Sequence, residues 1–200
     1  MLAVDDEPLG FSPIILCSLL AATKSANQVL YRNLTNELRT SIERLEKLSE
    51  SGRLFGNLPL SRAVELLKAH PSYDKITTLA GMEAFSRTVR RMPILPLAAA
   101  HMLPVGRFAR ALNESVRLLN MLSARKCAEL RRSGSAFMLE IENSPFASGS
   151  LSVKPQCSFY CGFLKAATSS FLGIQAPVEE ASCRSTMAGI SVCTFIIARV

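Results

Sequence analysis

The sequence contains no tryptophan, only 2 histidines and only 3 tyrosines among its 200 residues. Histidine is the most frequent general base in enzymes, so its scarcity leaves no Ser/His/Asp arrangement for nucleophilic catalysis. No Gly-x-Gly-x-x-Gly segment follows a predicted strand, and the chain therefore lacks the usual cradle for a dinucleotide hydride donor. These absences favour a binding module over an enzyme.

Long apolar stretches are also missing. The apolar run from Phe11 to Ala22 is shorter than the roughly 20 residues that a helix needs to cross a bilayer. Asp5, Asp6 and Glu7 precede this run, whereas a secretory signal begins with positive charge. We therefore expect a cytoplasmic protein without a membrane span.

The net charge is +7, but the basic residues are spread along the chain. No aromatic side chains alternate with the basic clusters, as they would in a protein that binds single-stranded nucleic acid. We expect a solvated surface and no direct contact with nucleic acid. The two tightest basic clusters comprise Arg87, Arg90 and Arg91, and Arg125, Lys126, Arg131 and Arg132.

Hydrophobic periodicity predicts helices in the first half of the chain and alternating strands in the second half. The order of these elements predicts an α+β fold, with N-terminal helices followed by an antiparallel sheet that has helices packed on one face. Helices are expected over 34–48, 59–70, 73–92, 107–123 and 155–172, and strands over 126–132, 136–142, 178–184 and 192–200.

Most of the cysteines lie near the C-terminus, and clustered thiols in an intracellular protein indicate a metal site more often than disulfides. Cys157 opens the last predicted helix, Glu180 and Cys183 share a predicted strand, and Cys193 begins the next strand. Three thiolates and one carboxylate can form a closed tetrahedral zinc site. Two alternatives remain: the cysteines are buried apolar residues, or Cys161, one helical turn after Cys157, replaces Cys157 or Glu180 as a ligand.

Several segments of the last hundred residues resemble the 4-vinyl-reductase (V4R) domain family. The resemblance implies a V4R/TRAPP-like α+β fold, a structural zinc held by Cys157, Glu180, Cys183 and Cys193, and a relation to the sensory domains of aromatic-responsive activators. The interval between Cys183 and Cys193 is longer than the family pattern, and the lack of tryptophan argues against phenol as the ligand. The matching segments are 143–147, 157–164, 172–173 and 178–183, together with Gly189 and 193–195.

The resemblance divides the chain into an N-terminal helical region, 1–92, which is a possible dimerisation element, and a V4R-like zinc-containing ligand-binding domain, 93–200. The pocket of this domain should accept a hydrophobic or aromatic small molecule, because such pockets are mostly apolar with few polar anchors. The alternative is that the aromatic residues are ordinary core. The expected lining residues are Phe108, Leu112, Phe137, Phe159 and Phe163, with His101 as a polar anchor or a heme ligand.

Taken together, these features predict a zinc-stabilised sensor or carrier module. No output domain follows the last predicted strand, so we expect it to act through a regulatory protein partner and to form a homodimer through the helix over 34–48. The alternative is a protein of tetrapyrrole (bacteriochlorophyll-type) biosynthesis with a vinyl-reductase-related or pigment-binding role.

Overall fold

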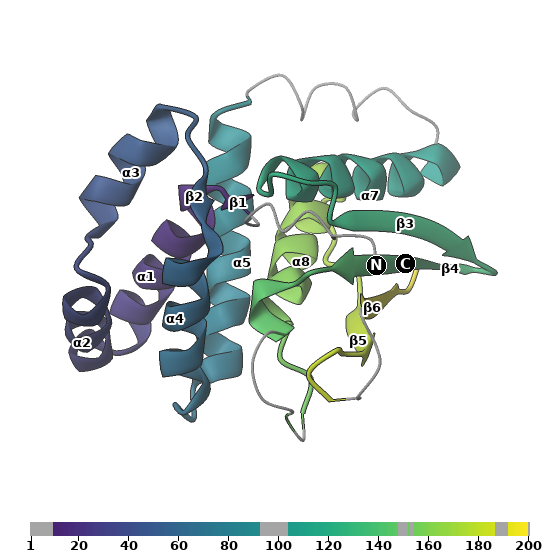
Figure 1. Cartoon of the computed structure of the whole chain (residues 1–200). Coiled ribbons are helices and arrows are strands. Elements are labelled where there is room, and N and C mark those ends of the chain that lie inside the picture. Colours follow the sequence, from purple (N-terminus) through teal and green to yellow (C-terminus); the bar gives the residue numbers. More distant parts are fainter. Residues whose placement is uncertain (1–9, 93–103, 148–151, 153, 187–191, 200) are drawn as a thin grey trace, which may run out of the picture.

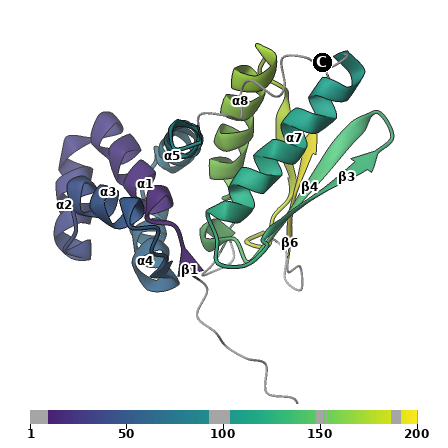
Figure 2. The same ribbon diagram turned by 90° about the horizontal axis from the view of Figure 1, so that it is seen from above.

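A computed structural model describes residues 10–92, 104–147, 152, 154–186 and 192–199. Helices occupy the N-terminal half, and an antiparallel sheet with helices on one face forms the C-terminal half (Figures 1 and 2), which confirms the predicted α+β class. The elements are β1 Gly10–Phe11, α1 Pro13–Ala26, α2 Gln28–Leu38, α3 Ile42–Glu50, β2 Phe55–Gly56, α4 Asn57–Lys68, α5 Tyr73–Arg90, α7 Pro104–Met121, β3 Ala128–Ser133, β4 Ala136–Glu142, the 3-10 turn η1 Pro145–Ala147, α8 Ser158–Leu172, β5 Val178–Ser182 and β6 Val192–Ile197.

The C-terminal sheet has the strand order β3-β4-β6-β5, with all neighbours antiparallel. Side chains alternate between the two faces of a strand. The buried face of β4 carries Leu139 and Ile141, and that of β6 carries Cys193, Phe195 and Ile197. Helices α7 and α8 pack on this face, and α5 lies against α8 on the side away from the sheet (Figure 2).

Helices α5 and α8 approach each other more closely than side chains usually allow. A Cβ atom on Gly81 of α5 would lie 1.9 Å from the Phe159 carbonyl oxygen. A Cβ atom on Gly162 of α8 would lie 2.0 Å from the Thr78 carbonyl oxygen. The two glycines therefore set the distance between the N-terminal helices and the layer that covers the sheet.

The apolar run near the N-terminus forms helix α1, which the periodicity did not predict. Ser12 caps the helix by accepting a hydrogen bond from the Ile14 amide, and Pro13 occupies its first turn, a position where proline is favoured. Almost every residue from Pro13 to Thr23 is buried. No described helix is long and apolar enough to cross a membrane.

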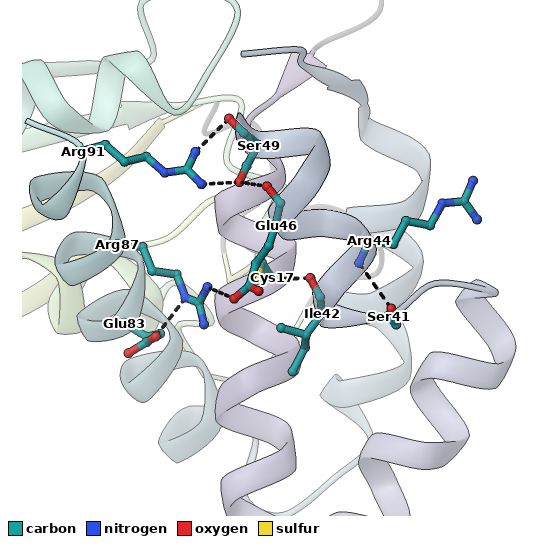
Figure 3. Close-up of polar contacts among 9 residues, drawn as sticks. All are labelled: Cys17, Ser41, Ile42, Arg44, Glu46, Ser49, Glu83, Arg87 and Arg91. Carbon is teal, nitrogen blue, oxygen red and sulfur yellow. Dashed lines mark hydrogen bonds and ion pairs between the residues drawn. The ribbon is translucent and has the colours of Figure 1, made fainter. Parts of the chain in front are cut away.

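The single helix predicted over 34–48 is wrong, because the chain forms two helices there. Arg39 adopts a left-handed conformation with φ 48° and ends α2. Ser41 then caps α3 by accepting a hydrogen bond from the Arg44 amide (Figure 3). The apolar stripe continues across this break because Leu34 and Leu45 both enter the core.

Two arginines hold α3 in place: Arg87 on α5 and Arg91, which directly follows the end of α5 (Figure 3). Arg87 donates to Glu46 of α3 at 2.6 Å and to Glu83 on its own helix at 2.8 Å. Arg91 donates to the Ser49 carbonyl oxygen at 2.7 Å, where the C-terminal end of a helix attracts positive charge. Helix α3 is thus attached to α5 through polar contacts as well as through the core that Leu45 enters.

Candidate functional site

Four potential metal ligands converge where α8 begins and β5 and β6 pair. One ligand atom from each of Cys157, Glu180, Cys183 and Cys193 can be chosen so that all lie within 4.8 Å of one another. The Cys157 sulfur lies 3.4 Å from the Cys193 sulfur and 3.8 Å from the Cys183 sulfur. Such a group of three thiols and a carboxylate matches the ligand set of a closed four-coordinate metal site.

A β-bulge brings Glu180 and Cys183 to the same side of the sheet. In a regular strand, residues three apart point to opposite faces. The register shifts between Glu180, which pairs with Phe195, and Ser182, which pairs with Thr194. Ala181 is the extra residue of the bulge and has no partner on β6. Cys183 therefore lies on the same face as Cys193.

The loop before α8 and the start of α5 position Cys157. Its amide donates to Glu180 Oε2 at 3.0 Å, and its sulfur lies 3.3 Å from Ser144 Oγ. The Tyr73 hydroxyl donates to the Gln156 carbonyl oxygen at 3.0 Å. These contacts fix both the N-cap residue of α8 and the Glu180 carboxylate that faces it.

The cluster is buried and its polar atoms are incompletely paired by the protein. All three sulfurs belong to side chains that are at most 1% exposed. Glu180 Oε1 is buried without a hydrogen-bond partner among the described residues, which is costly for a carboxylate unless a cation lies beside it. This unpaired oxygen leaves an acceptor that a positive ion could bind.

Burial and mutual hydrogen bonding set the pKa values of the four groups. Burial raises the pKa of the Cys157 thiol well above its usual value and raises the pKa of Glu180 to about 8. Hydrogen bonds from Cys157 and then from Cys193 lower the pKa of Cys183. Of the three thiols, Cys183 is therefore the one most easily held as a thiolate.

Cys161 lies one turn into α8 and is not part of the converging group. Its side chain is half-buried, and burial raises its pKa to about 11. The alternative in which Cys161 replaces Cys157 or Glu180 is therefore not favoured by the geometry.

Sequence reasoning missed Ser144 and Ser185, whose hydroxyls contact the Cys157 and Cys183 sulfurs at 3.3 and 3.0 Å. Serine is a common residue, and its presence near a cysteine carries no distinctive signal.

A second feature is a cavity of about 570 Å³ between α7 and the end of the sheet at the β3–β4 turn. Two of the predicted pocket residues, Phe108 and Phe137, line it with their ring centroids 5.7 Å apart. Leu112, Phe159 and Phe163 lie instead in the closed core, and His101 lies outside the described residues. The described residues that line it are Phe108, Ala109, Arg132, Ser135, Ala136, Phe137, Ala198 and Arg199.

Solved structures with the same arrangement of elements identify the fold. An H-NOX protein from S. oneidensis in the Fe(II)NO ligation state matches with a TM-score of 0.56 at 12% identity, covering 93% of this chain and 97% of that chain. The fold is that of H-NOX proteins. A doubly substituted variant of the Tt H-NOX protein matches with a TM-score of 0.53 at 12% identity, covering 94% of both chains. A structure described as modulating heme redox potential through protein-induced porphyrin distortion gives the same TM-score and identity and covers 94% of this chain and 99% of that chain.

The H-NOX likeness corrects the V4R/TRAPP resemblance. No protein-family model and no curated protein matches the chain, and solved structures that share its fold include H-NOX proteins. The segments behind the V4R resemblance are short, with at most eight consecutive residues in 157–164. They describe a local arrangement and not the family.

The expectation that the cofactor is zinc is contradicted as well. The choice of zinc over other ions that thiolates bind was supported by the V4R resemblance, whereas one solved structure with this fold is described with heme and an H-NOX structure is described with Fe(II). The geometry alone shows four potential metal ligands close together and does not identify an ion.

Proposed function

We propose that this chain is a small-molecule-binding sensor domain that passes its state to a partner protein. The observation that carries the proposal is the cavity between α7 and the sheet, whose volume of about 570 Å³ falls within the range of about 300–1,000 Å³ that is typical of ligand pockets. Its wall combines two phenylalanine rings with two arginines and a serine. The H-NOX likeness supports the proposal, since those structures are described in states of ligation.

A heme does not fit this cavity as the described residues line it. Heme iron is held in proteins by histidine, cysteine, methionine or tyrosine, and the described residues of the lining include none of these. His70 lies between α4 and α5, where its Nδ1 accepts a hydrogen bond from the Ser72 amide. We therefore derive no heme chemistry for the described part of the chain and propose an organic ligand.

The test is to fill the cavity. Ala109 of α7 lines it, and we expect Ala109→Trp to weaken binding of the neutral fluorescent probe N-phenyl-1-naphthylamine by at least about tenfold, because the indole would occupy the space of the probe. The measurement is a fluorescence titration with the folded protein. Ala69→Trp, on an exposed residue outside the lining, is the matched control and should bind like wild type. Absence of saturable binding to wild type, or equal binding by both variants, would contradict the proposal.

We also propose that Cys157, Glu180, Cys183 and Cys193 hold one metal ion with a structural role. The convergence of the ligands and the unpaired Glu180 oxygen support the proposal. Four protein ligands leave no open position for water or substrate, so the ion would tie α8 to β5 and β6 and would not activate a reactant.

Metal affinity is expected to rise steeply with pH. Cys157 and Cys193 have raised pKa values, and their thiols hold protons near pH 7. A bound ion must displace those protons, so affinity is lost as the pH falls, by about tenfold per pH unit for each proton released. Competition titrations with Co(II), followed by thiolate-to-cobalt charge-transfer absorbance at a series of pH values around neutrality, would measure the slope. An affinity independent of pH would contradict thiol ligation.

Self-association through the N-terminal helices stays a prediction. The helix on which it was based is divided into α2 and α3, but Val29 and Leu58 remain 67% and 81% exposed. Large apolar side chains that are this exposed are compatible with a protein interface, although single ones are common on monomers.

A further inference from the structure

Two consecutive arginines of β3 face opposite sides of the sheet. Arg131 pairs with Met138 and Arg132 pairs with Phe137 in the β3–β4 register. Cross-strand partners point to the same face, and Phe137 belongs to the face that carries the buried Leu139. Arg132 therefore lies on the helix-covered face, at the end where that face opens into the cavity.

The two arginines also differ in their partners. Arg131, on the outer face, lies 3.3 Å from Glu140 and 3.7 Å from Glu129. The contact of Arg132 within the described residues is a hydrogen bond from its Nε to the Gly134 carbonyl oxygen at 3.3 Å. Its guanidinium thus lines the cavity without a carboxylate of the described residues beside it.

The cavity as a whole combines an apolar floor with a cationic rim. Phe108 is 5% exposed and packs against Phe137, while Arg132 and Arg199 are exposed at the opening. The lining contains no aspartate or glutamate among the described residues. A guanidinium forms paired, charge-assisted hydrogen bonds with planar acidic groups, and aromatic rings favour flat apolar bodies.

We propose that the cavity binds an amphipathic organic anion, with its apolar body against Phe108 and Phe137 and its acidic group at Arg132 and Arg199. This inference rests on the proposed function, because it names the ligand class of the same cavity. The position of the rim arginines decides the orientation of the ligand: the acidic group stays at the opening, where it keeps part of its hydration, and the apolar body enters.

The experiment compares two probes that share an aromatic body. The anionic probe is 1-anilinonaphthalene-8-sulfonate, and N-phenyl-1-naphthylamine is its neutral counterpart. We expect Arg132→Ala to weaken binding of the anionic probe by about tenfold, as for the loss of a hydrogen bond to a charged group. The affinity for the neutral probe should stay the same. Arg131→Ala removes the same charge from the outer face and should change neither affinity. Decanoate should displace the anionic probe from wild type and Arg131→Ala, but about tenfold more weakly from Arg132→Ala.

Three results would overturn the inference. Arg132→Ala could bind the anionic probe like wild type, or Arg131→Ala could lose as much affinity, which would assign the effect to net charge. In either case, if Ala109→Trp still blocks the neutral probe, the cavity is a binding site and only the ligand class is wrong. If neither probe binds wild type saturably, the proposed function fails together with the inference. Thermal melting of each variant would verify that all of them are folded.

Discussion

Replacing Gly162 with alanine is expected to leave little or no folded protein. In the interior of a helix, glycine to alanine normally stabilises a protein by roughly 0.5–1 kcal/mol, because alanine restricts the unfolded chain. At Gly162 the sign should reverse, since the new methyl group would lie 2.0 Å from the Thr78 carbonyl oxygen. The Thr78 oxygen belongs to the backbone, and the backbone fixes the position of the new Cβ atom, so no side-chain rotation relieves the clash.

Relief requires α5 and α8 to move apart, and this separates the aromatic contacts around the crossing. Phe85 of α5 packs edge-on against Phe163 and Phe171 of α8, with centroids 5.4 and 5.5 Å apart. We expect a loss of more than about 4 kcal/mol, which exceeds the usual cost of an overpacked core. Soluble yield and circular dichroism melting would measure it.

The matched control is Ser170→Ala, which places the same residue on an exposed position of α8. This variant should melt within a few degrees of wild type. A Gly162→Ala protein with a wild-type melting curve would show that the two helices are farther apart than the structure places them.

Cys183→Ala is expected to abolish binding of the proposed metal ion and to lower the melting temperature. Cys183 is fully buried, and its sulfur lies 3.7 and 3.8 Å from the sulfurs of Cys193 and Cys157. Loss of one of four ligands leaves an incomplete site, and a structural metal contributes its binding free energy to folding. We expect a destabilisation of about 3 kcal/mol, or roughly 6–12 °C for a chain of this size.

A chelator distinguishes the loss of the ion from the loss of packing. Treatment of wild type should lower its melting temperature toward that of Cys183→Ala, whereas the variant should not respond. Cys161 lies on α8, one turn after Cys157, and is outside the cluster. Cys161→Ala should therefore retain both the metal and the sensitivity to the chelator. Elemental analysis of the three proteins completes the comparison, and a wild type that contains no metal and ignores the chelator would refute the site.

The sequence predicts the C-terminal half of the fold better than the N-terminal half. The strands predicted over 126–132 and 136–142 are found paired as β3 and β4, and the helix predicted to end at 172 does end there as α8, followed by Gly173 with φ 74°. Helix α1 escaped prediction because it is buried on nearly all sides, and a helix without a polar face has no 3.6-residue period. The break at Arg39 escaped because its left-handed conformation is carried by a residue type that rarely adopts it.

The candidate site was predictable in its members but not in its geometry. The residue types and their order place Cys157, Glu180, Cys183 and Cys193 on adjoining elements, yet strict alternation would have put Glu180 and Cys183 on opposite faces. The bulge that unites them depends on pairing with β6, which is a long-range property. By contrast, the inward position of Arg132 was readable from its parity with Leu130 and from the hairpin register.

The turn between β3 and β4 determines which side chain of β3 faces the cavity. Gly134 and Ser135 close a two-residue turn between Ser133 and Ala136, with Gly134 at φ 59°, a conformation that glycine adopts readily and that such short turns require. Turn length fixes which side chain stands opposite Phe137, and a slip of one residue would exchange the faces of a whole strand. Inserting one residue between Ser133 and Gly134 while the turn keeps its length would place Ser133 opposite Phe137 in place of Arg132, so a change in the length of β3 would remove a positive charge from the cavity wall.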